Sequence, residues 1–160
     1  MDRANATESQ GLVHPATALD HFRLERHPVE PPLDRVLDRF WRTEWRLAEP
    51  FVQSIVTFPV VNFVIQSDGS AVVSGVQRRN DERRLEGAGW ALGAMFRPAG
   101  FRPFVSTPAS AFTDRRLPAH EVFGPAVEAL VRDVVADDGG PSAVMALARF
   151  LSERLPAQPT

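Results

Sequence analysis

The first half of the chain alternates between apolar and polar residues, which is the pattern of half-buried strands. In residues 41–47 the odd positions are apolar or hydroxyl-bearing and the even positions are charged, and residues 90–96 resume the alternation with Trp90 and Phe96 on one face. Three β-branched and aromatic runs lie between them, at residues 51–58, 60–66 and 71–76, with a tight turn at residues 67–70. Because no helical pattern separates these five runs, we expect an antiparallel barrel or sandwich, with charged residues 78–86 at an exposed hairpin end.

The pattern changes to a helical period in the second half. Residues 98–105 predict a short helical turn and residues 106–118 a loop. Apolar residues then recur at α-helical spacing after Gly124 and Pro125, and again after Pro141. The segment Asp-Asp-Gly-Gly at residues 137–140 separates the two stripes and predicts an αα-hairpin. The expected fold class is therefore α+β, an antiparallel β-barrel or sandwich followed by a C-terminal helical hairpin.

These patterns divide the chain into four parts. Residues 1–30 are expected to form an N-terminal arm, because they lack sustained periodicity and end in a proline-rich connector. Residues 31–118 form the β-region, residues 119–155 the helical hairpin, and residues 156–160 the start of a linker. The total length of 160 residues is that of one domain with its own core.

Three residue types that many enzymes depend on are absent: cysteine, lysine and tyrosine. Their absence excludes disulfides, thiolate metal sites, Schiff-base lysines and phenolic acid–base catalysis. The formal net charge of −2 differs from the basic excess of a nucleic-acid-binding domain. The N-terminal ten residues are polar, and no apolar stretch approaches the length of a membrane span, so we expect a cytoplasmic protein.

The familiar catalytic and cofactor motifs give no positive signal. Three of the four histidines lie in residues 1–30 and no His-x-His pair occurs, so we predict neither a metal site nor catalytic residues. The glycines at positions 87, 89 and 93 loosely resemble a dinucleotide-binding fingerprint. That motif must open a helix, whereas a strand-like run follows here, so a barrel corner or bulge explains them better and no cofactor is expected.

Aromatic residues on the predicted strands suggest a ligand cavity inside the barrel. Two arginines lie between phenylalanines just after the last strand, where they could orient an anionic or hydroxylated ligand at the mouth of such a cavity. If the aromatic faces of two strands both point inward, their indoles converge on one volume. The alternative is that the same aromatic side chains form a plain core. The candidate ligand-binding residues are Trp41, Trp45, Phe63, Trp90, Phe96, Arg97 and Arg102.

One segment of the sequence resembles the N-terminal domain of a group of bacterial AraC-type transcriptional regulators. It comprises Leu-Glu-Gly at residues 85–87, Gly-Ala-Met-Phe-Arg-Pro-Ala-Gly-Phe at 93–101, Phe-Thr-Asp at 112–114 and Val-Phe-Gly at 122–124. The group typically has Gly-Ala where this chain has Ala99-Gly100. The resemblance covers residues 30–155 and implies a cupin-like effector-sensing barrel, followed by helices that dimerise or relay the signal. The family's DNA-reading helix-turn-helix pair would follow this domain.

Three functions are compatible with these observations. The leading hypothesis is the ligand-sensing and dimerisation domain of a transcription regulator, which would bind a small-molecule effector and form a homodimer through residues 125–155. A second is a stand-alone small-molecule-binding protein or non-metal barrel enzyme that acts on a small organic acid or sugar. A third is a scaffold with a solid barrel whose only task is dimerisation. The hypothesis of a sensing domain further predicts that this chain alone does not bind DNA specifically.

Overall fold

Two antiparallel sheets and a C-terminal group of helices make up the part of the chain that the structure describes, which is residues 22–55, 60–77 and 81–156 of this computed structural model. The α+β class predicted from the sequence is confirmed. The strands are β1 (Phe22–His27), β2 (Leu37–Arg46), β3 (Phe51–Ile55), β4 (Asn62–Gln66), β5 (Ala71–Ser74), β6 (Asp81–Leu85), β7 (Ala88–Phe96) and β8 (Arg116–Pro118). The helices are α3 (Ala119–Phe123), α4 (Val127–Ala136) and α5 (Pro141–Arg154), with short 3₁₀ turns η1 (Leu33–Arg35), η2 (Arg102–Phe104) and η3 (Ala109–Phe112).

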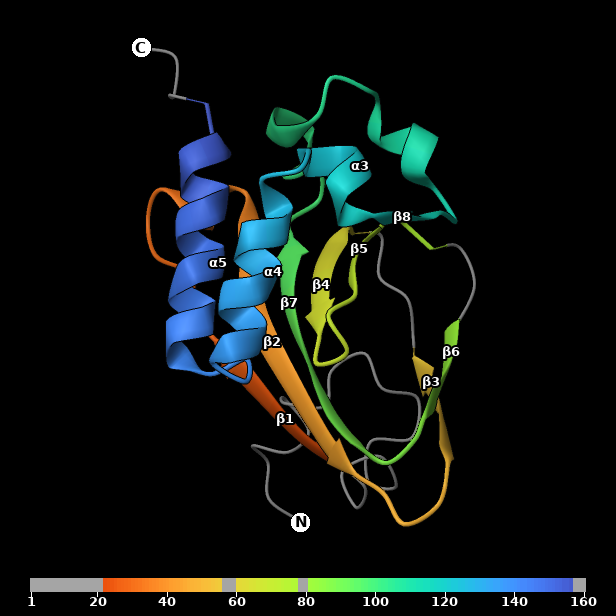
Figure 1. The fold of residues 1–160 in the computed structure, drawn as a ribbon. Coiled ribbons are helices and arrows are strands. Elements are labelled where there is room, and N and C mark those ends of the chain that lie inside the picture. Colours follow the sequence, from red (N-terminus) through yellow and green to blue (C-terminus); the bar gives the residue numbers. More distant parts are fainter. Residues whose placement is uncertain (1–21, 56–59, 78–80, 157–160) are drawn as a thin grey trace.

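The larger sheet has the strand order β1-β2-β7-β4-β5-β8, and the smaller sheet pairs β3 with β6. All of these pairings are antiparallel. Helices α4 and α5 pack on each other and lie over one face of the larger sheet (Figure 1). Within the described residues, no helix has the length and apolar character needed to cross a membrane.

The two sheets are joined by one long antiparallel ribbon. Arg46 pairs with Ala88 at the end of the larger sheet, the Leu47 amide donates to the Gly87 carbonyl at 2.8 Å, and Phe51 pairs with Leu85 in the smaller sheet. Residues 47–50 of one strand therefore lie opposite only residues 86 and 87 of the other. Extra residues in one strand of an antiparallel pair bend the ribbon at that point. In Figure 1 the ribbon runs down through β2 and β7, turns at the lower end and comes up again through β3 and β6.

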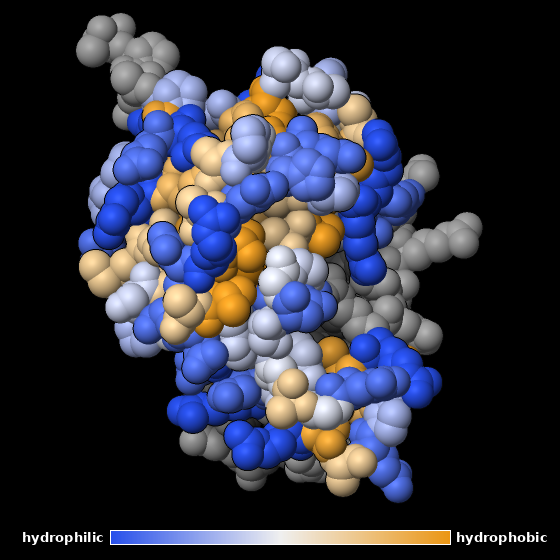
Figure 2. Space-filling model, in the orientation of Figure 1, coloured by the Kyte–Doolittle hydropathy of each residue, from blue (hydrophilic) through white to orange (hydrophobic). Residues whose placement is uncertain are grey.

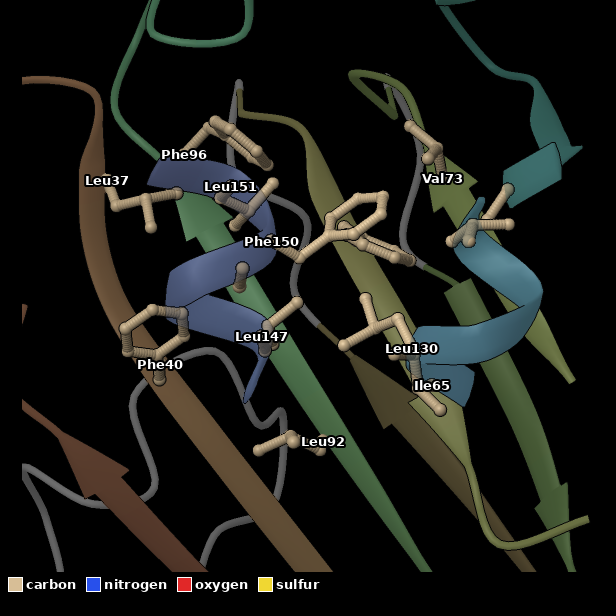
Figure 3. Close-up of a cluster of buried hydrophobic side chains, with 14 of the residues drawn as sticks. Leu37, Phe40, Ile65, Val73, Leu92, Phe96, Leu130, Leu147, Phe150 and Leu151 are labelled. Atoms are coloured by element: carbon tan, nitrogen blue, oxygen red, sulfur yellow. The ribbon is translucent and has the colours of Figure 1, made fainter. Parts of the chain in front are cut away.

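The main hydrophobic core lies between the larger sheet and helices α4 and α5. Because side chains alternate across a strand, every second residue of β4, of β7 and of the part of β2 that follows its bulge at residue 38 points toward the helices. Phe63, Ile65 and Leu92 from the sheet are fully buried, as are Leu147 and Leu151 from α5. Figure 3 shows Ile65 and Leu92 of the sheet and Leu147 and Leu151 of α5 directed toward one another. We call this side of the larger sheet the helix face and the other side the open face.

Four details differ from the sequence-based expectations. Residues 22–27, assigned to the arm, form edge strand β1, which the sequence obscured because four of its six residues are charged or histidine. Residues 81–85 are not a hairpin end but strand β6 of the smaller sheet. The expected loop at 106–118 contains η3 and β8, and helix α3 precedes the predicted hairpin. Residues 1–21 of the arm, residues 56–58 of the predicted run at 51–58 and most of the linker start lie outside the described residues.

Other expectations are confirmed. The helical turn predicted at residues 98–105 is η2, and the αα-hairpin is α4 and α5. The Asp-Asp-Gly-Gly segment ends α4 as expected, with Asp138 and Gly139 both at positive φ. The Asp137 carboxylate accepts a hydrogen bond from the Ala143 amide at 2.9 Å, which satisfies a free N–H in the first turn of α5.

Candidate ligand-binding face

The larger sheet separates the aromatic residues that the sequence suggested would converge. Trp41 pairs with Gly93, so Trp41 shares a face with the odd-numbered residues of β7, whereas Trp90 is even-numbered. Phe63, Trp90 and Phe96 belong to the core under the helices, and Trp41 and Trp45 belong to a second cluster on the open face. The expectation that the indoles converge on one volume is therefore wrong. Each strand's own alternation was predicted correctly, but the register between the strands was not predictable.

The two arginines expected at the cavity mouth lie elsewhere. Arg97 follows β7 and its Nε donates to the Asp34 carbonyl of η1 at 2.8 Å, while its own amide donates to Val36. Arg102 is exposed in η2. Among the contacts that the described residues make, none joins either arginine to Trp41 or Trp45. Arg97 thus serves to fix the end of β7 against η1.

On the open face, the indole of Trp41 lies across β7. A Cβ atom at Gly93 would overlap Cε2, Cζ2 and Nε1 of this indole, so only glycine allows the ring to lie so close to the strand. The indole Nε1 donates a hydrogen bond to Oδ1 of Asn62 on β4 at 3.1 Å. The side chain thereby extends from β2 over β7 to β4, with one ring face against the sheet.

Trp45, four residues after Trp41 on β2, is arranged in a similar way. It pairs with Gly89, where a Cβ would stand 2.6 Å from Cζ2 of the indole, and its Nε1 donates to the Glu86 carbonyl at 3.3 Å. Trp45 is buried together with Val64 and Ala91, and Leu47 and Leu85 pack against this cluster. Trp41 is only partly buried. Of the two indoles, Trp41 therefore offers the more accessible ring surface.

Polar side chains surround Trp41 on the open face. Arg26 of β1 is its direct cross-strand partner, and Arg39 lies two positions before it on β2. The side chain of Arg39 is only 17% exposed and its Nε contacts the Asp38 carboxylate, at a bulge that leaves Asp38 without a partner in β7. Asn62 holds the far end of the indole. This set, Trp41 with Arg26, Arg39 and Asn62, is called the Trp41 site below.

Sequence reasoning missed the three polar members of the Trp41 site. Arg39 could have been found, because it alternates in phase with Trp41. Arg26 could not, because strand β1 was not recognised. Asn62 lies in a predicted strand, but its face depends on the register of β4 against β7, which no local pattern reports.

Trp90 on the helix face contacts the turn between α4 and α5. The guanidinium of Arg42 lies 5.9 Å from the Trp90 ring centroid, and it donates to the carbonyls of Asp138 and Gly139 at 2.9 and 3.0 Å. A Cβ at Gly139 would stand 2.8 Å from the Trp90 ring. Arg42 and Trp90 therefore fasten the helical hairpin to the middle of the larger sheet.

The remaining chemistry of the described residues is sparse. No group of three or more histidine, cysteine or carboxylate side chains in the described ranges is placed to hold a metal ion. The Trp41 site itself offers a ring surface, an amide and guanidinium groups. These are binding groups rather than nucleophiles.

Comparison with known proteins identifies a family. No curated protein and no solved structure matches the chain. One family model matches, a domain of unknown function named DUF6597, over residues 25–118. This range begins within β1, includes both sheets and ends with β8, so it contains the whole Trp41 site. The chain belongs to the DUF6597 family.

Proposed function

We propose that this domain is the effector-sensing and dimerising part of a cytoplasmic transcription regulator, and that its effector is a small molecule bound at the Trp41 site. The sequence resemblance to AraC-type regulators over residues 30–155 supports the regulatory class. In such a protein the DNA-reading helices belong to a separate domain, in keeping with the net charge of −2 of this chain.

The proposal rests on one observation, which is that the two faces of the larger sheet carry different kinds of side chains. The helix face is filled by α4 and α5 and forms the main core. The open face carries an indole that lies flat on a glycine, with an amide and two arginines beside it. A flat aromatic surface with a few polar groups at its edge is the usual composition of a small-molecule site.

The same two strands connect the Trp41 site to the helices. On β2, Trp41 faces the site and the next residue, Arg42, holds the α4–α5 turn. On β7, Gly93 underlies the indole, and Trp90 contacts Gly139 from the other face. A ligand that binds more tightly when these strands adopt one twist shifts the population of hairpin positions, and the energy available equals its difference in affinity between the two states.

Dimerisation is proposed to use the outward side of the helical hairpin. Leu147 and Leu151 are fully buried against the sheet and take no part in it. Met145 on α5 is 65% exposed, and Val144 and Ala148 of α5 and Val131 of α4 are only partly buried. Figure 2 shows apolar residues gathered over the two helices on this side of the molecule. A second copy of the hairpin is the occupant that a regulator of this class requires.

A fusion assay tests the regulatory function. The domain is joined to a DNA-binding domain that occupies its operator only as a pair, and repression of a reporter gene is measured. We expect repression that Met145→Glu removes and that Ala48→Glu, an exposed control in the β2–β3 loop, leaves intact. Absence of repression by a folded fusion, together with a monomeric domain in sedimentation at about tens of micromolar, would contradict the dimerising function. In a gel-shift assay the domain alone is expected to show no sequence-selective DNA binding.

A further inference from the structure

Three uncharged polar side chains lie around the indole of Trp41 on the open face. The strand registers place Thr43 and Gln66 in one row across the sheet. Trp41 lies in the next row and Asn62 in the row after that. Neighbouring rows on one face are about 7 Å apart along a strand. A ligand that stacks on the indole is therefore flanked by uncharged polar side chains on two sides.

These side chains have polar atoms that the protein itself leaves unused. Within the described residues, neither Thr43 nor Gln66 forms a side-chain hydrogen bond, and Asn62 forms one, with Trp41. In the same ranges, the one buried side-chain nitrogen or oxygen without a partner is Nε2 of His27. The unused polar atoms of Thr43, Asn62 and Gln66 are therefore accessible to solvent, and hence to a ligand.

Asn62 offers hydrogen-bond donors in a fixed direction. An indole Nε1–H can only donate, so the amide oxygen of Asn62 faces Trp41, at 3.1 Å. The NH₂ group of Asn62 is therefore directed away from the indole nitrogen and offers two N–H donors. The ligand group that meets this edge of the ring must be an acceptor, such as a carbonyl oxygen.

The arginines of the same face already have interactions within the protein. Arg26, Arg39 and Arg116 each interact with other groups of the chain, and Arg39 also contacts the Asp38 carboxylate. A charged ligand loses its hydration on binding and needs a counter-charge in return, whereas an uncharged polar group needs only a hydrogen bond. The side chains with unused polar atoms therefore favour an uncharged ligand.

We propose that the effector is an uncharged, planar heterocycle that carries a cyclic amide. Its ring stacks on Trp41, its carbonyl oxygen accepts a hydrogen bond from the Asn62 amide, and its other edge binds Thr43 and Gln66. Hydroxyl and amide side chains both donate and accept, which matches the N–H and C=O groups of a cyclic amide. This inference rests on the proposed function and names the ligand class of the same site.

Matched probes test the requirements for neutrality and planarity. The planar cyclic amide 2-quinolone is compared with quinoline-2-carboxylate, an anion of similar size, and planar 2-pyridone with its puckered counterpart 2-piperidone. Binding is measured by isothermal titration. We expect 2-quinolone to bind about 10-fold or more tightly than the carboxylate, and 2-pyridone about 3-fold or more tightly than 2-piperidone, because a flat ring stacks better on an indole. The affinity for 2-quinolone should not fall between about 0.01 M and 0.3 M salt, since no ionic contact is screened.

Substitutions on the open face locate the binding site. Asn62→Asp keeps an oxygen that accepts from Trp41 but replaces the NH₂ donors by a second oxygen, so we expect it to weaken 2-quinolone binding about 10-fold or more. Thr43→Val removes only a hydroxyl and should weaken it about 3-fold. Ser142→Asp adds the same charge at an exposed position of α5 and should leave binding unchanged. If Asn62→Asp fails to fold, Thr43→Val and the probe comparisons still test the inference.

Three results would overturn the inference. Tighter binding of the carboxylate, with an affinity that falls as salt is added, would show that the site selects an anion; the sensing function then stands if Trp41→Phe weakens that binding. Equal binding of 2-pyridone and 2-piperidone would show that the ligand does not stack on the indole. If no cyclic amide binds, the ligand class is wrong, and the fusion assay decides separately whether the dimerising function holds.

Discussion

The indole of Trp41 rests on the backbone of Gly93, and neither residue can change without affecting the other. A Cβ atom at Gly93 would overlap three atoms of the indole. The Nε1–Asn62 hydrogen bond prevents the ring from swinging away without losing a partner. The pair thus determines both the shape of the open face and the packing of β2 on β7.

A double-mutant cycle tests this dependence. Gly93→Ala is expected to lower the free energy of unfolding by about 1–3 kcal/mol, because the added methyl group displaces the indole. In a Trp41→Ala background the same substitution should cost much less, since the overlapping atoms are gone. Urea denaturation of the four proteins gives the coupling energy, expected to be about 0.5–3 kcal/mol. An equal cost in both backgrounds would show that the indole does not lie on Gly93.

The contact between Trp90 and the α4–α5 turn is tested at Gly139, which has a φ of 65°. Its control is Gly69, which has a φ of 87° and where an added Cβ atom would meet no other atom within 4 Å. Gly69→Ala should cost about 1–2 kcal/mol of stability through backbone strain alone. Gly139→Ala should cost about 1 kcal/mol more, because its Cβ also meets the Trp90 ring. Equal costs at the two positions, measured by urea denaturation, would contradict the contact.

Hydrogen exchange tests whether the hydrogen bonds of Arg42 hold the α4–α5 turn. The amides of residues 139 and 140 donate to Val134 and Asp137, both at 3.0 Å. Arg42→Met removes the donors to the two turn carbonyls, so these amides should exchange faster relative to those of β7. Unchanged protection of the turn in Arg42→Met would show that Arg42 does not hold the hairpin.

Two substitutions on α5 separate the core from the dimer surface. Leu147→Ala should lower the free energy of unfolding by about 2–5 kcal/mol, because Leu147 is fully buried. Met145→Ala should change it by less than about 0.5 kcal/mol, yet weaken self-association in sedimentation equilibrium. A dimer that survives Met145→Glu unchanged would place the interface elsewhere.

The pH dependence of stability has one identified contribution, at Asp68 in the β4–β5 turn. The Ser70 hydroxyl, and then the Ser70 amide that donates to Oδ1 at 2.9 Å, hold the pKa of Asp68 below its ordinary value of 3.8. A lowered pKa means that the folded state favours the ionised form. The stabilisation is therefore complete above pH 3.8 and is lost as the pH falls through the lowered pKa.

Asp68→Ala accordingly should be less stable than the unaltered protein near neutral pH, with the difference disappearing in strong acid. An NMR titration of Asp68 should also show its pKa rise in Ser70→Ala. A stability difference that grows toward low pH would have the opposite sign and contradict this assignment.

The elements of the fold were largely predictable because they depend on local periodicity. The alternation in residues 41–47 and 90–96 corresponds to β2 and β7, and the two apolar stripes correspond to α4 and α5. Strand β1 was missed because its residues are mostly charged or histidine, and it is stabilised by pairing with β2 rather than by its own pattern.

The candidate site was only half predictable, because it depends on contacts between strands. Trp41 was identified as an aromatic residue of one strand face. Its placement opposite Gly93 instead of beside Trp90 follows from the β2–β7 register, and a shift of one residue would have reversed it. Arg26 and Asn62 enter the site through the registers of β1 and β4, which are likewise long-range.

The central claim is that the open face at Trp41 binds the effector, and the indole N–H resonances of the three tryptophans test it most directly. In ¹H–¹⁵N spectra, assigned through Trp41→Phe, Trp45→Phe and Trp90→Phe, a bound small-molecule ligand should shift the Nε1–H of Trp41 the most. Trp90, under the helices, should shift less, by way of the α4–α5 turn. A ligand that shifts Trp90 while leaving the Trp41 resonance in place would contradict the account.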